Sequence, residues 1–196
     1  MHQSSDESSL KLDLAISGLT FTLPSGYINL LDHEVETPET LLPYTRLARA
    51  QGLKVVAAKV TPSGIHTFEA TSTPAPGAMN RRTAELVLGF MARPRLFSPP
   101  VARITDIQLL KIAGIDCARA ETESVASGST TKVLVYLMSC GRDLIAAQFG
   151  CPPERWSTTV QLFDSTARET KGLKKCHSDF GYYLGWRVGY FLRNLR

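Results

Sequence analysis

Four cysteines are the side chains of this chain best suited to chemistry: Cys117, Cys140, Cys151 and Cys176. A nucleophilic cysteine needs a nearby base and a lowered pKa. Cys140 has the most site-like position, because it ends an apolar segment next to a turn, and the possible bases are His33, His66 and His177. Since sequence spacing places none of these histidines beside Cys140, we interpret this cysteine as a small buried apolar residue.

Other polar groups indicate no catalytic or metal site. Cys176 and His177 are adjacent, so their side chains diverge in any regular structure, and no further ligands follow at metal-site spacing. Asp32-His33-Glu34 could orient a water or bind a cation, but such a triplet is more typical of a solvated loop before a helix. The chain contains no glycine-rich phosphate loop, nucleophile elbow or His-Glu-x-x-His motif. We therefore predict no catalytic residue, no metal ligand and no cofactor.

The segment from Ile104 to Trp156 is expected to organise the rest of the chain as four short strands joined by tight turns. Such short links make neighbouring strands antiparallel, because a parallel neighbour needs a long crossover. Lys132–Cys140 is apolar on both faces and rich in β-branched and aromatic residues, which predicts a central strand covered on both sides. Pro152 and Pro153 then start a helix. One face of that helix carries the apolar residues Trp156, Val160, Phe163 and Ala167.

The remaining elements follow from alternation, turns and capping residues. Strands are expected at Leu10–Ile16, Leu19–Leu23, Tyr27–Leu31 (an edge strand), Leu53–Val60 and Ile65–Thr73. A helix is expected from Thr37 as N-cap to Gln51, unless Pro43 marks its true start. A second helix is expected over Asn80–Ala92, with Leu86, Phe90 and Val87 as candidates for its inward face. Helices between groups of strands predict the α+β class, an antiparallel β-sheet with helices packed on it.

Size and charge indicate one soluble globular domain. The chain has 196 residues, 43% of them hydrophobic and 20% charged, and a net charge of +4. No basic stripe is interleaved with aromatics, which argues against nucleic-acid binding. We expect a disordered tail over 1–9, a single domain over 10–175 and a C-terminal amphipathic helix over 176–196. The even number of cysteines suits an oxidising compartment without matching a disulfide framework, and no signal peptide is visible. The chain is therefore expected to be either cytosolic or the mature form of an exported protein.

The last segment, Ser178–Arg196, is predicted to be a helix that contacts protein. Apolar residues recur at helical spacing at Leu184, Val188, Phe191 and Leu195. Small residues that permit close backbone approach stand beside this stripe at Gly181, Gly185 and Gly189. The stripe could close over the chain's own sheet, dock on a partner or a second copy, or lie on a membrane surface with Trp186 and Tyr190 at the headgroups. The hypothetical partner-binding residues are Gly181, Gly185, Trp186, Gly189 and Tyr190.

The order of these elements resembles the PsbP-like superfamily. The resemblance rests on Phe21–Tyr27, on Ile112–Gly114 with the following strand and Gly128, on the Lys132–Phe149 hairpin, and on the Pro153–Thr170 helix. This superfamily includes an extrinsic photosystem subunit, a eukaryotic Ran-binding relative, and many bacterial envelope proteins and secretion adaptors. The resemblance implies an α/β/α sandwich and no catalytic residues.

The expected function is therefore a non-enzymatic binding or adaptor protein of a bacterial envelope or secretion system, acting through protein contacts. A periplasmic location is favoured if a signal peptide precedes this sequence. The alternatives are a small thiol-dependent hydrolase with a Cys/His pair and a toxin-neutralising, immunity-type binding protein.

Overall fold

Nine strands and three α-helices form the described part of the chain in a computed structural model, which describes residues 9–15, 17–32, 36–50, 52–74, 79–91, 101–126 and 129–175. The strands are β1 (Leu10–Leu14), β2 (Leu19–Leu23), β3 (Ile28–Asn29), β4 (Val55–Thr61), β5 (Gly64–Pro74), β6 (Val101–Ile112), β7 (Ile115–Ala126), β8 (Ser129–Cys140) and β9 (Asp143–Cys151). The α-helices are α1 (Leu42–Ala50), α2 (Arg81–Met91) and α3 (Trp156–Arg168). Short 3₁₀ turns, η1 (Glu39–Leu41) and η2 (Pro153–Arg155), lead into α1 and α3.

Seven strands form one antiparallel sheet in the order β3-β4-β5-β9-β8-β7-β6. The four strands β6 to β9 are the meander that the sequence predicts, and they are longer than expected. The β6–β7 and β8–β9 turns are tight, with positive φ at Ala113, Gly114 and Gly141. β8 lies inside the sheet, and its residues from Leu134 to Cys140 are buried on both faces. The predicted α+β fold with a central Lys132–Cys140 strand is confirmed.

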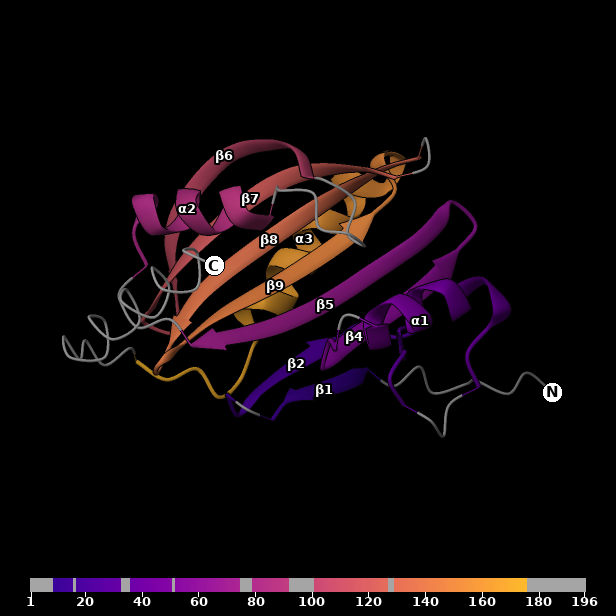
Figure 1. The fold of residues 1–196 in the computed structure, drawn as a ribbon, viewed down its shortest axis with the longest axis horizontal. Helices are drawn as coiled ribbons and strands as arrows, with labels where there is room; N and C mark the ends of the chain where they lie inside the picture. Colours follow the sequence, from indigo (N-terminus) through magenta and orange to yellow (C-terminus); the bar gives the residue numbers. More distant parts are fainter. Residues whose placement is uncertain are drawn as a thin grey trace, which may run out of the picture.

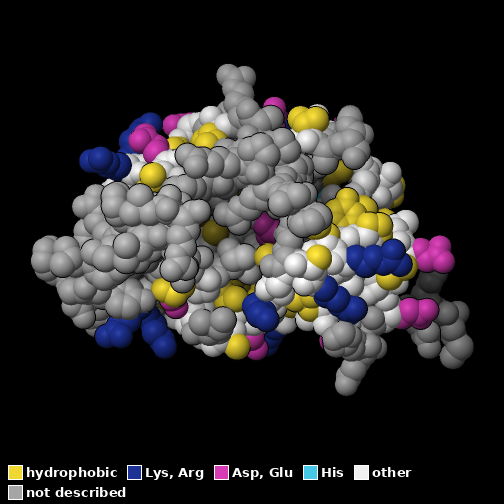
Figure 2. All heavy atoms as spheres, in the orientation of Figure 1, with side chains coloured by type: hydrophobic (Ala, Val, Ile, Leu, Met, Phe, Trp, Pro, Cys, Tyr) yellow, Lys and Arg dark blue, Asp and Glu magenta, His cyan; other side chains and the backbone are white. Residues whose placement is uncertain are grey.

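The sheet is the middle of three layers (Figure 1). α3 and the separate two-stranded sheet of β1 and β2 cover one face, and α1 and α2 cover the other. Figure 2 views the face of α1 and α2, where hydrophobic side chains are visible among acidic and basic ones. Each helix of the described ranges is too short or too polar to cross a membrane.

A chain of phenylalanine rings joins the layers on the α3 side. Phe21 of β2 lies 5.1 Å from Phe68 of β5, between ring centroids. Phe68 lies 4.8 Å from Phe149 of β9, which is 5.0 Å from Phe163 of α3. Tilted and offset pairs at these separations are favourable beyond simple burial. Because all four rings are buried, they fix where α3 and β2 sit on the sheet.

The segment after α3 returns to the N-terminal hairpin. Thr20 and Lys171 exchange two backbone hydrogen bonds of 3.1 and 3.0 Å. Gly172 has φ +82°, and a Cβ there would lie 2.1 Å from the carbonyl oxygen of Gly18. Glycine is therefore required for this close approach. The backbone N–H of Gly141 also donates to the carbonyl of Lys174 at 2.9 Å, which fixes this segment against the β8–β9 turn.

Two local predictions for the helices need correction. The N-cap of η1 is Pro38, without a side-chain cap, and α1 begins at Leu42. The predicted N-cap at Thr37 is therefore wrong, and Pro43 lies in the first helical turn, where its missing N–H costs nothing. Leu86 of α2 is 52% exposed, not inward, because α2 turns Ala84 and Leu88 toward the sheet.

Some predictions fall outside the described residues. They are the tail over 1–8, the side chain of Phe90, and the whole of 176–196, including Gly181, Gly185, Trp186, Gly189 and Tyr190. The domain division also stays a prediction.

Candidate functional site

A groove of about 350 Å³ opens between the start of α3 and strands β6 to β8. We call it the Trp156 groove. Its lining residues come from four elements: Asp106 and Gln108 of β6, Arg119, Glu121, Thr122 and Glu123 of β7, Lys132 of β8, and Trp156 of α3. Strand alternation sends Arg119, Glu121 and Glu123 to the same side of β7. The side chains that line the groove are therefore held by regular elements.

Arg119 anchors a partly buried network behind the groove. Its side chain is 11% exposed, and its Nε donates to Asp164 Oδ1 of α3 at 2.9 Å. Its Nη2 donates to Glu121 Oε1 at 3.0 Å. The hydroxyl of Tyr136 also donates to Asp164. These bonds connect β7, β8 and α3 through charge-assisted hydrogen bonds, which are stronger than neutral ones.

The network keeps Arg119 charged and Tyr136 protonated. Burial alone would lower the pKa of Arg119, but the hydrogen bonds and charges of Asp164 and Glu121 outweigh it and raise that pKa. Burial, followed by the hydrogen bond to Asp164, raises the pKa of Tyr136 above its usual range. Neither group is therefore a proton donor or acceptor near neutral pH, and both act as fixed hydrogen-bond donors.

Trp156 forms one wall of the groove in a fixed orientation. Its indole N–H donates to Glu121 Oε2 at 3.2 Å. Lys132 Nζ lies 5.8 Å from the centre of the Trp156 ring and 3.7 Å from Glu123 Oε1. Glu121 thus connects Trp156 to Arg119. A half-buried aromatic ring held in this way is a typical binding anchor.

Carboxylates outnumber cations around this groove. Asp106, Glu121 and Glu123 line it with Arg119 and Lys132, and Asp164 lies directly behind Arg119. Arg119 is already neutralised by two carboxylates. The groove therefore has a net negative charge, which favours a cationic ligand.

Cys140, the thiol of the alternative hydrolase interpretation, is a buried residue, as the sequence interpretation expects. Cys140 is 3% exposed, and its Sγ accepts the backbone N–H of Lys174 at 3.1 Å. His66 lies in β5. Thr67 pairs with Gly150 of β9, and the same antiparallel register continued by one residue places His66 opposite Cys151. His33 and His177 are outside the described residues.

The described thiols are buried, and burial holds Cys117 and Cys151 in the protonated form. Burial raises the pKa of Cys117 and of Cys151 to about 11. Cys151 is fully buried, which opposes formation of a reactive thiolate. Where the chain is described, no three His, Cys, Asp or Glu side chains group closely enough to hold a metal ion.

The Trp156 groove was missed at the sequence level, although part of its signal was present. Arg119, Glu121 and Glu123 alternate with small residues along β7, which places three charges on one side of a strand. Asp164, the partner of Arg119 on α3, lies 45 residues further along the chain. Only the packing of α3 on the sheet reveals that it completes the network.

Comparison with known proteins finds similarity in structure. No protein-family model and no curated protein matches the chain. The solution structure of cyanobacterial PsbP (CyanoP) from Synechocystis sp. PCC 6803 is similar with a TM-score of 0.58 and 14% identity, covering 87% of this chain and 95% of CyanoP. The fold is PsbP-like.

A second similar structure is that of LpqN, which is involved in cell envelope biogenesis of Mycobacterium tuberculosis. The match has a TM-score of 0.49 and 10% identity, and it covers 83% of this chain and 89% of LpqN. The match to CyanoP confirms the PsbP-like resemblance at the level of the fold. At such identity it assigns no function to the residues of the groove.

Proposed function

We propose that this PsbP-like chain is a non-catalytic binding protein that holds a basic segment of a partner protein in the Trp156 groove. The observation that supports this most is the Arg119–Asp164–Glu121 network. It fixes Trp156, and Asp106 and Glu123 add two further carboxylates to the lining, of which Glu123 lies 3.7 Å from Lys132. Tryptophan is enriched among the residues that dominate binding energies, and a preorganised one loses little entropy on binding.

The charge of the groove selects the class of partner. A lysine or arginine side chain could approach the carboxylates of Asp106 and Glu123 and pack its aliphatic stem on Trp156. The groove is shallow compared with an enclosed ligand cavity, which suits one or two side chains of a larger protein. Complementary charge of this kind contributes to the rate and specificity of association.

The setting of this binding role belongs to the same proposal. The PsbP-like resemblance implies a bacterial envelope or secretion system, and we propose this location for the chain. Fractionation of the native host, followed by detection of the protein, tests the location. An immunity-type protein would use the groove in the same way, and the identity of a captured partner distinguishes the two.

A direct test uses peptides of known charge. We expect a short oligolysine peptide to bind the full chain in isothermal titration calorimetry, and an oligoglutamate peptide of equal length not to bind. Asp106→Asn together with Glu123→Gln should weaken oligolysine binding about tenfold, equivalent to ~1.4 kcal/mol. Trp156→Phe should weaken it further, because the indole hydrogen bond to Glu121 is lost.

Glu85→Gln on α2 is the matched control, because Glu85 is exposed and pairs only locally with Arg81. It should leave peptide binding unchanged. Equal losses in Glu85→Gln and in the groove variants would show general electrostatic attraction and would contradict the proposal. So would a host partner captured equally well by wild type and by Glu123→Lys.

A further inference from the structure

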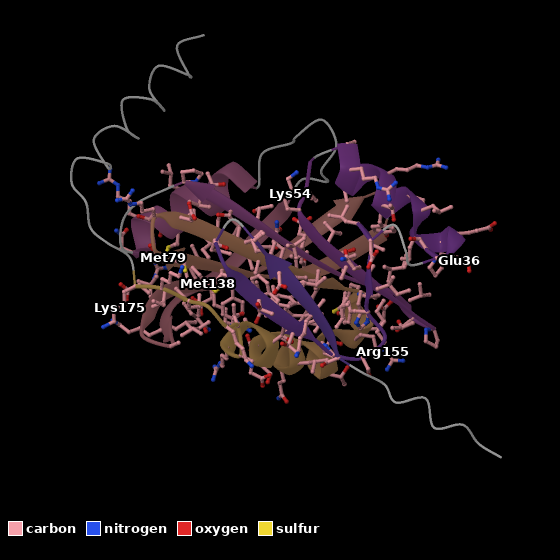
Figure 3. The ribbon with its side chains drawn as sticks, turned by 90° about the horizontal axis from the view of Figure 1, so that it is seen from below. Glu36, Lys54, Met79, Met138, Arg155 and Lys175 are labelled. Atoms are coloured by element: carbon pink, nitrogen blue, oxygen red, sulfur yellow. The ribbon has the colours of Figure 1, made fainter. Side chains whose placement is uncertain are left out.

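A second cavity, of about 250 Å³, lies on the other side of the start of α3. It is bounded by the loop after β2, the β4–β5 hairpin and the first turns of α3. The lining residues are Pro24, Tyr27, Lys59, Thr61, His66, Arg155, Thr158, Thr159 and Leu162. Figure 3 labels one of them, Arg155, which lies at the N-terminal end of α3. We call this cavity the Lys59 pocket.

Two side chains that line the Lys59 pocket each bury a polar atom that lacks a hydrogen-bond partner in the described part of the chain. Tyr27 is 7% exposed and His66 is 9% exposed. Within the described part of the chain, neither Tyr27 Oη nor His66 Nε2 has a hydrogen-bond partner. Buried polar atoms are satisfied in the great majority of native proteins, so each exception requires an explanation. Both residues line the same cavity, so a bound ligand is the simplest explanation for their unsatisfied atoms.

Two cations are held at this pocket by single hydrogen bonds. Lys59 Nζ donates to the carbonyl of Ser25 at 2.8 Å, and Arg155 Nε donates to Ser63 Oγ at 2.9 Å. An ammonium has three N–H donors and a guanidinium has five, so these bonds fix each group and leave further donors for a ligand. Thr158 and Thr159 also line the pocket, and the Thr158 hydroxyl donates to the carbonyl of Arg155 at 3.0 Å.

The backbone around Lys59 is closely fitted. A Cβ at Gly26, where φ is +83°, would lie 2.8 Å from Lys59 Nζ. A Cβ at Gly64, where φ is +132°, would lie 2.7 Å from Pro152 Cγ. Glycine at these two positions lets the loop after β2 pass close to the Lys59 side chain and lets the β4–β5 hairpin pass close to Pro152. Three separate segments of the fold therefore line the pocket.

The electrostatics favour an anion. Burial, and then the charges of Lys59 and Arg155, lower the pKa of His66, so the surroundings of His66 are positive. Among the described residues that line the pocket, none is acidic. Glu154 is adjacent to Arg155 in sequence but does not line the cavity.

We propose that the Lys59 pocket binds a phosphate-type oxyanion, either inorganic phosphate or the phosphate group of a small ester. A tetrahedral oxyanion offers acceptors in several directions at once, which matches donors from Lys59, Arg155, His66 and Tyr27. The volume of the cavity is smaller than that of a typical drug-sized site and suits a small group. The pocket and the Trp156 groove have opposite charge preferences, so this proposal stands independently of the proposed function.

The test is a titration of the full chain with inorganic phosphate at constant ionic strength, with chloride as the reference salt. We expect saturable binding, and a shift of the His66 side-chain nitrogen resonances on NMR. Lys59→Gln and Arg155→Gln should each raise the dissociation constant at least tenfold. Lys54→Gln is the matched control, because Lys54 is an exposed lysine that precedes β4 and lies outside the pocket, and it should bind as wild type.

Two further arms identify the source of the phosphate group. Glycerol phosphate tests a small ester, and flotation with phosphatidic acid vesicles against phosphatidylcholine vesicles tests a lipid headgroup. Circular dichroism of each variant verifies folding, and Arg155→Gln removes an exposed side chain that the core does not need. The proposal is overturned if phosphate fails to shift His66, or if Lys54→Gln weakens binding as much as Lys59→Gln. Binding to vesicles alone would also overturn it.

Discussion

At the scale of single residues, charged groups are buried here only where they are paired. Arg119 is nearly enclosed, and Asp164 and Glu121 compensate its charge. An unpaired buried charge would be strongly destabilising, so the three residues function as a unit. By contrast, Tyr27 and His66 are buried without partners in the described part of the chain. The Arg119 network connects β7, β8 and α3, whereas the unsatisfied atoms of Tyr27 and His66 support the proposed ligand site in the Lys59 pocket.

His66 predicts a pH dependence of stability. Its pKa in the folded protein lies below the 6.5 of the free side chain, chiefly because of burial. As the pH falls through about 6.5, the unfolded chain takes up this proton first, so unfolding becomes more favourable. Urea unfolding at a series of pH values should therefore show a loss of stability on acidification. The loss should be smaller in His66→Gln. The uptake of one proton changes the free energy of unfolding by at most about 1.4 kcal/mol per pH unit.

The difference between the wild-type and His66→Gln curves isolates the contribution of His66. Curves that remain parallel from neutral pH down to pH ~5 would show that His66 has an ordinary pKa. Lys59 and Arg155 face His66, and their charges lower its pKa after the larger effect of burial.

At the scale of elements, α3 is the helix that the pattern of apolar residues predicts best. Phe163 and Ala167 are buried, and Trp156 and Val160 are partly buried against the same core. The meander and α3 could be predicted because their contacts are local in sequence and their turns carry glycine or proline. The inward face of α2 could not, because Leu86 and Leu88 are equally apolar and only the packing distinguishes them. The network of the candidate site was also hidden, since Arg119 and Asp164 meet only through tertiary packing.

Phe163 should contribute most of the packing energy of α3. Phe163→Ala removes a ring that is 1% exposed and is expected to cost about 3–5 kcal/mol of unfolding free energy. Trp156→Ala should cost less, because its ring is only partly buried. Leu162→Ala is the control on the same helix, since Leu162 is 44% exposed, and it should change stability by less than about 0.5 kcal/mol. Denaturant titration would contradict this view of α3 if Phe163→Ala and Leu162→Ala had similar effects.

At the scale of the whole molecule, two sites of opposite charge lie on either side of the start of α3. Trp156 faces the groove with its carboxylates, whereas the neighbouring Arg155 faces the pocket with its cations. One helix start, held by η2 and Pro152, thus positions both sites. The predicted contact through Gly181, Gly185 and Gly189 lies outside the described residues and stays a prediction.

The cysteines provide a measure of global opening that also separates a binding protein from a thiol enzyme. Cys117, Cys140 and Cys151 are each at most 3% exposed. In a Cys176→Ser variant, we expect reaction with a thiol reagent at neutral pH to be slow and to accelerate with urea in step with unfolding. One cysteine that reacts rapidly in the native protein would instead favour the thiol hydrolase.

The pairing of Thr20 with Lys171 and the contact of Gly172 on Gly18 also affect how the chain is synthesised. The β1–β2 hairpin is synthesised before the other described strands, yet Lys171, which pairs with its Thr20, is synthesised after all of them. The row of rings that begins at Phe21 and Phe68 is likewise complete only once Phe149 and Phe163 have been made. During translation the backbone groups of Thr20 therefore gain their Lys171 partner only after α3 has been synthesised.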